Sequence, residues 1–272
     1  MITEPMEPPT LAGLDLAVEG NLGRMTLNRP EKLNPLATEV LAAIADAAAW
    51  FDTIRDVKVV VVAGEGRAFS AGADISGFAG ATDDLSIRDR AELGSKMADS
   101  LEAMRAVTVA KIHGYCIGGA VVLASACDFR VAAESTKFSI PEVDLGIPLT
   151  WGGIPRLIRE IGAPATRDLV MTCRQFGAGE AERLGLIQRV VPDDSLDDEV
   201  EALAQVLLWK AALPLLATKR NVDAVTSTMI GRDRTWADAD SIVSAYQDDE
   251  SRQAAYKYVA ALADKRKGDA GS

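Results

Sequence analysis

The stretch HGYCIGGAVVLASACDFRVAA, residues 113–133, decides the fold. It follows a short apolar segment, 108–112, which we expect to be a strand, and it begins with the small residues of Gly114–Ala120. The apolar segment 118–126 has the length of a buried core helix, and 129–132 is again of strand type. The stretch therefore predicts a strand, a glycine-rich turn, a buried helix and a second strand, the order found in α/β domains.

The same alternation extends to both sides of this stretch. Segment 57–63 (VKVVVVA) is β-branched and almost wholly apolar, which predicts a central strand buried on both faces. The other expected elements are a hairpin of 14–19 with 24–28 around the turn 20–23, helices over 38–55 and 87–106, short helices and turns over 152–186, and helices beyond Pro192.

These elements predict one α/β domain with a helical C-terminal extension. We expect a disordered tail over 1–13, a core domain over 14–194, a helical region over 195–263 and a C-terminal tail over 264–272. No apolar run reaches the roughly 18 residues that a membrane span needs, so no span is expected.

Charge and composition narrow the class of protein further. The net charge of −11 argues against a nucleic acid as the main partner. The single histidine, His113, leaves no room for a His-rich metal site or a Ser-His-Asp triad, so no metal is expected. The three cysteines, Cys116, Cys127 and Cys173, cannot all pair and match no zinc spacing, which indicates reduced core residues in a cytoplasmic protein.

Two loops have the composition of a site that holds an oxygen atom by backbone N–H groups. Ser70–Ile75 and Gly114–Ala120 each follow a short apolar strand and place small residues before a helix. The first turn of a helix has N–H groups without an intrahelical partner, and two such groups aimed at one oxygen form an oxyanion hole. Taken singly, each loop is also explained by tight packing, and neither matches a phosphate-binding or dinucleotide-binding fingerprint.

Five motifs in order resemble the crotonase, or enoyl-CoA hydratase/isomerase, superfamily. They are LNRPEKLNPL (27–36), GRAFSAGADI (66–75), the stretch 113–133, FSIPEVDLGI (138–147) and GLIQRVVP (185–192). The resemblance implies a crotonase-like fold of repeated strand-strand-helix units. It also implies an acyl-CoA thioester as substrate, with no separate cofactor because coenzyme A is part of the substrate, and a homotrimer or hexamer formed through 195–263.

The resemblance also assigns roles to residues of the two loops. The N–H groups of Ala73 and Gly119 would hold the thioester oxygen, and Asp74 would brace its loop. The implied binding residues for the CoA thioester are Lys32, Leu33, Ala71, Gly72, Ala73, Asp74, Ile75, Gly118, Gly119 and Val122. The basic residues Lys265, Arg266 and Lys267 either add to this site or form a solvated tail.

The acid and base groups determine which reaction such a site performs. Hydratases that this chain resembles use two glutamates; one position is Glu142, and the other is Val122, which cannot move a proton. Isomerases of the family manage with one glutamate, and dienoyl-isomerases add an aspartate at the position of Thr150. Isomerase chemistry at Glu142 is therefore favoured, with an atypical hydratase or lyase and a non-catalytic acyl-CoA binder as alternatives.

Several residues near these motifs have a structural alternative. Glu142 is either a buried base with a raised pKa or a surface glutamate in a turn, and Trp151 is either its apolar wall or a core tryptophan. We expect His113, inside a strand, and Asp128 to be structural, and we place Asp144 outside the chemistry.

Overall fold

The computed structural model of the protein describes residues 7–74, 87–231, 235 and 237–269, with side chains up to residue 263. A six-stranded sheet has the order β1-β2-β3-β4-β6-β9. Its strands are β1 (Leu14–Glu19), β2 (Leu22–Leu27), β3 (Val59–Gly64), β4 (Val107–Ile112), β6 (Phe129–Ala133) and β9 (Arg189–Val191). Only β1 and β2 pair antiparallel, so the rest of the sheet is parallel, as expected for an α/β domain.

Strand β3 shows why its sequence is continuously apolar. Val60 and Val62 belong to the larger hydrophobic core, together with α1 (Thr38–Thr53), α2 (Ile87–Ala103) and α3 (Gly119–Ser125). Val59 and Val61 point to the other face and pack with α6 (Leu196–Leu208). Because successive side chains of a strand point to opposite faces, a strand covered on both sides needs apolar residues throughout. The prediction of a central buried strand is confirmed.

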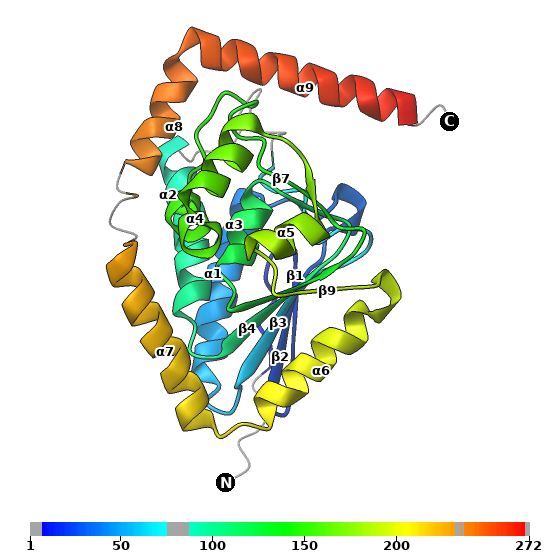
Figure 1. The fold of residues 1–272 in the computed structure, drawn as a ribbon, viewed down its shortest axis with the longest axis vertical. Coiled ribbons are helices and arrows are strands. Elements are labelled where there is room, and N and C mark those ends of the chain that lie inside the picture. Colours follow the sequence, from blue (N-terminus) through cyan, green and yellow to red (C-terminus); the bar gives the residue numbers. More distant parts are fainter. Residues whose placement is uncertain (1–6, 75–86, 232–234, 236, 270–272) are drawn as a thin grey trace.

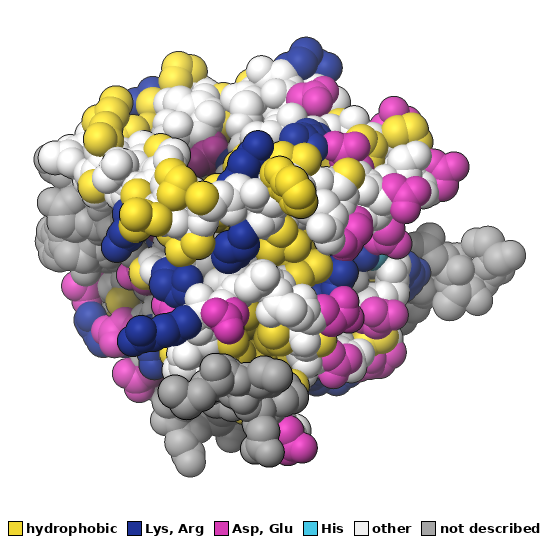
Figure 2. All heavy atoms as spheres, turned by 90° about the horizontal axis from the view of Figure 1, so that it is seen from below, with side chains coloured by type: hydrophobic (Ala, Val, Ile, Leu, Met, Phe, Trp, Pro, Cys, Tyr) yellow, Lys and Arg dark blue, Asp and Glu magenta, His cyan; other side chains and the backbone are white. Residues whose placement is uncertain are grey.

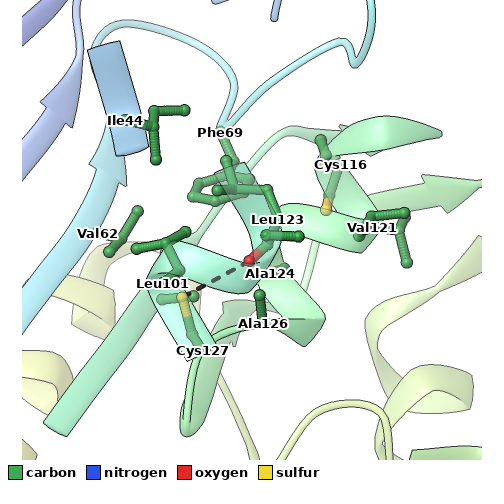
Figure 3. Close-up of a cluster of buried hydrophobic side chains, with 14 of the residues drawn as sticks. Ile44, Val62, Phe69, Leu101, Cys116, Val121, Leu123, Ala124, Ala126 and Cys127 are labelled. Atoms are coloured by element: carbon green, nitrogen blue, oxygen red, sulfur yellow. Dashed lines mark hydrogen bonds between the residues drawn. The ribbon is translucent and has the colours of Figure 1, made fainter. Parts of the chain in front are cut away.

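Helix α3 lies in the middle of the larger core. Figure 3 shows it among side chains from other segments, including Ile44, Val62, Phe69 and Leu101. The thiol of Cys127 donates a hydrogen bond to the carbonyl of Leu123 at 3.7 Å. All three cysteines are free and buried, as the sequence predicts.

A second, three-stranded sheet was not predicted. It consists of β5 (Tyr115–Ile117), β7 (Lys137–Ser139) and β8 (Phe176–Gly177), in that order. His113 lies between β4 and β5 rather than inside a strand, and one of its ring nitrogens bonds to the carbonyl of Gly66. The small sheet therefore includes residues of the second glycine-bearing loop, and its strand β7 ends shortly before Glu142.

The remaining helices match the prediction except between 152 and 186. There, α4 (Gly153–Thr172) consists of two helical segments that meet at Gly162, whose φ is 73° and ψ 164°, and α5 (Ala178–Leu184) follows. The hairpin turn is also tighter than expected, since β2 begins at Leu22.

The C-terminal region is helical, as expected. Figure 1 shows α7 (Ala212–Met229) along one side of the molecule, and α9 (Asp249–Asp269) continuing from α8 (Asp238–Gln247) across the top of the view. Two short 3-10 turns, Pro30–Lys32 and Asp193–Ser195, complete the described elements. No single described helix has the length and apolar composition to cross a membrane. Segment 193–208 and α7 reach that length and composition only when taken together, and the pair is bent by 108°.

Candidate active site

The loop after β3 is held in place by the segment that follows β2. The amide of Ala71 donates to the carbonyl of Leu33 at 2.8 Å, and the amide of Leu36 donates to the carbonyl of Gly72 at 2.8 Å. Leu33 has a left-handed φ of 62°, which turns the chain toward this loop. The structure therefore brings Leu33 and the 71–74 loop together, as the resemblance implied, with Lys32 exposed beside them. Ile75 lies outside the described residues.

The second loop is joined to the first by backbone contacts. The amide of Ser70 donates to the carbonyl of Tyr115, and the amide of Ile117 donates to the carbonyl of Ser70. Gly72 has a φ of 84°, and a Cβ at this position would lie 2.2 Å from the carbonyl oxygen of Ile117 and 3.4 Å from the amide nitrogen of Gly119. Only glycine fits so close an approach with this φ. The two glycine-bearing loops therefore meet at Gly72.

The backbone N–H groups of both predicted oxyanion-hole residues have no backbone acceptor among the described residues. The amide of Gly118 is occupied, because it donates to the carbonyl of Ser139 at 2.8 Å. The amides of Ala73 and Gly119 have no backbone acceptor within the described part of the chain. Gly119 is the first residue of α3, whose first amides have no intrahelical partner. Ala73 and Gly119, the predicted oxyanion-hole residues, are thus among the amide donors of the two loops that have no backbone acceptor.

Glu142 is a buried carboxylate next to the second loop. Its exposed fraction is 8%, and its Oε1 lies 2.6 Å from the position that a Cβ on Gly118 would take. Its Oε2 is buried and has no hydrogen-bond partner among the described residues. Burial raises the pKa of Glu142 from 4.5 to about 7, because the charged form loses its hydration. These features contradict the alternative of a surface glutamate in a turn.

The face of α3 that follows Gly119 is apolar. Val122 is buried, and its Cγ2 lies 2.9 Å from the position that a Cβ on Gly153 would take. The second carboxylate of a two-glutamate site is therefore replaced by a packed valine. Thr150, at the position where dienoyl-isomerases have an aspartate, is buried and has no carboxyl group. Asp144 is exposed.

Trp151 packs against Gly119 itself. A Cβ at Gly119 would lie 2.3 Å from Cζ3 of the indole, so the ring covers this glycine. The structure places the ring against Gly119, next to Gly118, the glycine that the carboxyl group of Glu142 contacts. Trp151 also has a left-handed φ of 60°, which is rare for a bulky residue.

A buried arginine holds the turn that carries Trp151. Nη1 of Arg156 donates to the carbonyls of Trp151 and Gly152, both at 3.1 Å. Its Nη2 bonds to Asp99 at 2.7 Å and to Glu102 at 2.6 Å, which neutralises the buried charge. Sequence reasoning missed Arg156, since a single arginine in a helical stretch carries no signal of its own.

Asp128, which we expected to be structural, accepts hydrogen bonds from three donors. Oδ2 of Asp128 accepts from the amide and the hydroxyl of Thr108 at 2.7 and 2.9 Å, and from Nζ of Lys219 at 2.7 Å. Asp128 therefore joins β4 and α7 to the segment that leads into β6. The side chains of Lys265, Arg266 and Lys267 are not among those that the structure describes. In the described part of the chain, no group of His, Cys, Asp and Glu side chains could hold a metal ion.

Comparison with known proteins agrees with this arrangement. A family described as enoyl-CoA hydratase/isomerase matches residues 17–269. The chain is 38% identical over 203 residues to a probable enoyl-CoA hydratase of Mycobacterium bovis, which covers 74% of this chain and 77% of that one. It is 34% identical over 243 residues to a crotonyl-CoA hydratase of Syntrophomonas wolfei, covering 89% and 93% of the two chains.

The fold agrees as well. The crystal structure of an enoyl-CoA hydratase from Mycobacterium avium subsp. paratuberculosis superimposes with a TM-score of 0.82 at 27% identity, covering 92% of this chain and 100% of that one. The order of motifs, the two joined loops and the buried glutamate therefore have one explanation. The chain has a crotonase fold and belongs to the enoyl-CoA hydratase/isomerase family.

Proposed function

We propose that this protein is an enoyl-CoA isomerase that moves a double bond with a single glutamate. Glu142 takes a proton from C2 of a 3-enoyl-CoA, and the electron pair forms an enolate on the thioester. The amides of Ala73 and Gly119 stabilise the enolate oxygen. Glu142 then returns the proton to C4, and the product is the 2-enoyl-CoA. Each step uses groups of the chain and the thioester itself, so no further cofactor is required.

The observation that carries the proposal is the environment of Glu142. A general base works best when its pKa is near the working pH, and burial raises the pKa of Glu142 to about 7. Its Oε2 has no partner among the described residues, so this oxygen is free to accept a proton from a ligand. The carboxyl group of Glu142 contacts Gly118, which is the residue next to the Gly119 donor. This contact supports a base close to the oxyanion hole.

Val122 favours isomerisation over hydration. Adding water across a double bond requires a group that orients the water, and a buried valine packed on Gly153 supplies none. The second candidate is nevertheless a hydratase with an atypical second acid, because the relatives at 38% and 34% identity are named hydratases. The third candidate, an acyl-CoA binder without chemistry, needs only the two amides.

The test is a substrate panel with product analysis. The purified protein is given trans-3-enoyl-CoA and trans-2-enoyl-CoA thioesters, and the products are separated by liquid chromatography. We expect conversion of the 3-enoyl to the 2-enoyl thioester and little 3-hydroxyacyl-CoA. Faster hydration than isomerisation would establish the hydratase instead. No turnover together with tight acyl-CoA binding would establish the binder.

Val122→Glu sharpens this test. The variant restores a two-carboxylate pattern and should raise hydration of a 2-enoyl-CoA relative to isomerisation. The new carboxylate must fit against Gly153 and costs stability unless it is hydrogen-bonded. Val122→Gln is the matched control, because it has the same size and polarity without a base. Equal hydration by both variants would show that position 122 does not determine the reaction.

We further propose that the protein is a cytoplasmic homotrimer or hexamer assembled through its C-terminal helices. The exposed hydrophobic residues of α6, α7 and their junction support assembly: Val206, Trp209, Leu213, Val222, Val225 and Met229. Figure 2 views the end of the molecule where α6 meets α7 and shows hydrophobic side chains among lysines and arginines. Light scattering at micromolar concentration should give three or six times the monomer mass. A monomer would contradict this proposal.

A further inference from the structure

The indole of Trp151 fills a slot between two helices that is lined by glycine on both sides. A Cβ at Gly94 in α2 would lie 2.1 Å from its Nε1, and a Cβ at Gly119 in α3 would lie 2.3 Å from its Cζ3. Real Cβ atoms do not approach other atoms so closely. The ring therefore occupies the space that any side chain at position 94 or 119 would need.

This slot adjoins Gly119, the residue whose amide holds the thioester oxygen in the proposed function. Gly119 and Val122 are three residues apart on a helix, so they share a face. Glu142 covers the neighbouring Gly118, and the amide of Gly119 has no backbone acceptor among the described residues. A thioester whose oxygen is held by Gly119 therefore binds next to two side chains: the carboxylate of Glu142, which contacts Gly118, and the indole of Trp151, which contacts Gly119.

The position of the indole is fixed by its backbone. Trp151 and Gly152 both have a left-handed φ, 60° and 66°. A left-handed tryptophan persists only where its surroundings impose it. Here Arg156 holds the carbonyls of both residues, and the amide of Gly152 donates to Oδ2 of Asp238 at 3.0 Å. The backbone is thus held in place, and the glycines on both sides enclose the ring, so the indole has little room to rotate away from a ligand.

We propose that Trp151 is the end wall of the acyl site and restricts the protein to short acyl chains. The proposal rests on the proposed function, since it assumes that the thioester oxygen lies at Gly119. A long chain would meet the indole, and the ring has no free space to enter, because Gly94 and Gly119 already contact it. A short chain ends before the ring. Trp151 is thus a specificity-determining residue for the same site.

The test replaces Trp151 with alanine and, as a smaller change, with leucine. For parent and variants, kcat/KM is measured with 3-hexenoyl-CoA and 3-dodecenoyl-CoA, and the Kd of saturated hexanoyl-CoA and dodecanoyl-CoA is measured by calorimetry. The matched control is Trp50→Ala, which removes an indole of equal size from α1, where it contacts Phe51. The control reports any loss of activity that follows from destabilisation alone.

We expect the long-to-short ratio of kcat/KM to rise at least about tenfold in Trp151→Ala, and the ratio of affinities to shift the same way. Trp151→Leu should give a smaller shift, and Trp50→Ala should leave both ratios unchanged. Unchanged ratios in both Trp151 variants, with turnover intact, would overturn the wall and leave the proposed function standing. A shift in affinity without turnover in the parent would support the wall and contradict the isomerase.

Discussion

The two ends of α3 differ in how their polar groups are satisfied. At the C-terminal end, Asp128 accepts three hydrogen bonds, and Nη1 of Arg130 donates to the carbonyl of Cys127 at 2.6 Å. At the N-terminal end, the amide of Gly119 and Oε2 of Glu142 have no partner among the described residues. Buried polar groups are normally paired, so unpaired ones identify where a ligand is expected.

The comparison teaches that burial by itself does not distinguish a catalytic acid from a structural one. Asp128 and Glu142 both flank α3 and both are largely removed from water. Asp128 accepts hydrogen bonds from three donors. For Glu142, the loss of hydration outweighs one hydrogen bond to its own backbone, so its pKa is raised. The number of donors around each carboxylate, rather than its depth, separates the two roles.

The largest expected effect tests the two acids against each other in catalysis. Glu142→Gln keeps the shape of the side chain but cannot accept a proton, so isomerisation should fall by about 10²–10⁴-fold. Binding of a saturated acyl-CoA should be almost unchanged. Asp128→Asn is the matched control at the other end of the helix and should keep the turnover of the parent. An equal loss of turnover in the two variants would contradict the assignment of a catalytic role to Glu142 and a structural role to Asp128.

The second prediction removes the free donor of Gly119. A proline at this position has no N–H, but its ring would collide with Trp151, so the substitution is made in Trp151→Ala. The double variant should have a kcat/KM lower by about 10²–10³-fold than Trp151→Ala alone, the usual effect of losing one oxyanion-hole donor. Circular dichroism confirms folding. Equal kcat/KM in the folded double and single variants would show that this amide binds no oxyanion.

The third prediction concerns stability and has opposite signs at the two ends. Between pH 4.5 and about 7 the folded protein keeps a proton on Glu142 that the unfolded chain has lost, so the free energy of unfolding falls as pH rises. Glu142→Gln should be more stable than the parent at pH 8, by up to about 3 kcal/mol, and similar at pH 4. Urea titration at both pH values measures this.

The other end of α3 should respond in the opposite direction. Asp128→Ala leaves the ammonium group of Lys219 buried without its partner, and should lower the free energy of unfolding by about 2–4 kcal/mol at pH 8. A stabilised Asp128→Ala, or a destabilised Glu142→Gln at pH 8, would contradict the assignment of roles.

The smallest predicted effect is the pH dependence of the rate. Since Glu142 must be ionised to act as a base, kcat/KM should rise about tenfold per pH unit below its pKa of about 7 and level off above it. Initial rates from pH 5 to 9 measure the profile, after a check that the protein stays folded throughout. A plateau that begins near pH 4.5 would mean that Glu142 is hydrated in solution.

Much of this molecule was predictable from the sequence, because its main elements are long or strongly patterned. The buried strand and the central helix have continuous apolar sequences, and the oxyanion-hole residues lie in motifs with fixed spacing. The strands β5, β7 and β8 were missed because two or three residues are too few to show alternation. The long helix α4 was missed because Gly162 and Pro164 interrupt its pattern.

The part of the site that could not be predicted depends on contacts between distant segments. Gly94 gives no sign in the sequence that an indole will lie on it, since Trp151 approaches it only in the folded chain. The same holds for Arg156, which donates to two backbone carbonyls and pairs with two acids of another helix. None of these contacts is visible in the sequence. Motifs locate the chemistry, whereas the residues that shape the acyl site become visible only in three dimensions.

The buried cysteines allow the local unfolding of the protein to be measured. Burial raises the pKa of the Cys127 thiol to about 12 and that of Cys116 further still, so neither is a nucleophile in the folded state. A small alkylating reagent therefore modifies each thiol only when its surroundings open. Cys116 lies in β5 beside the ligand loops, and Cys127 lies at the far end of α3. Their separate alkylation rates would report how often each end of the helix comes apart, and which of them an acyl-CoA holds closed.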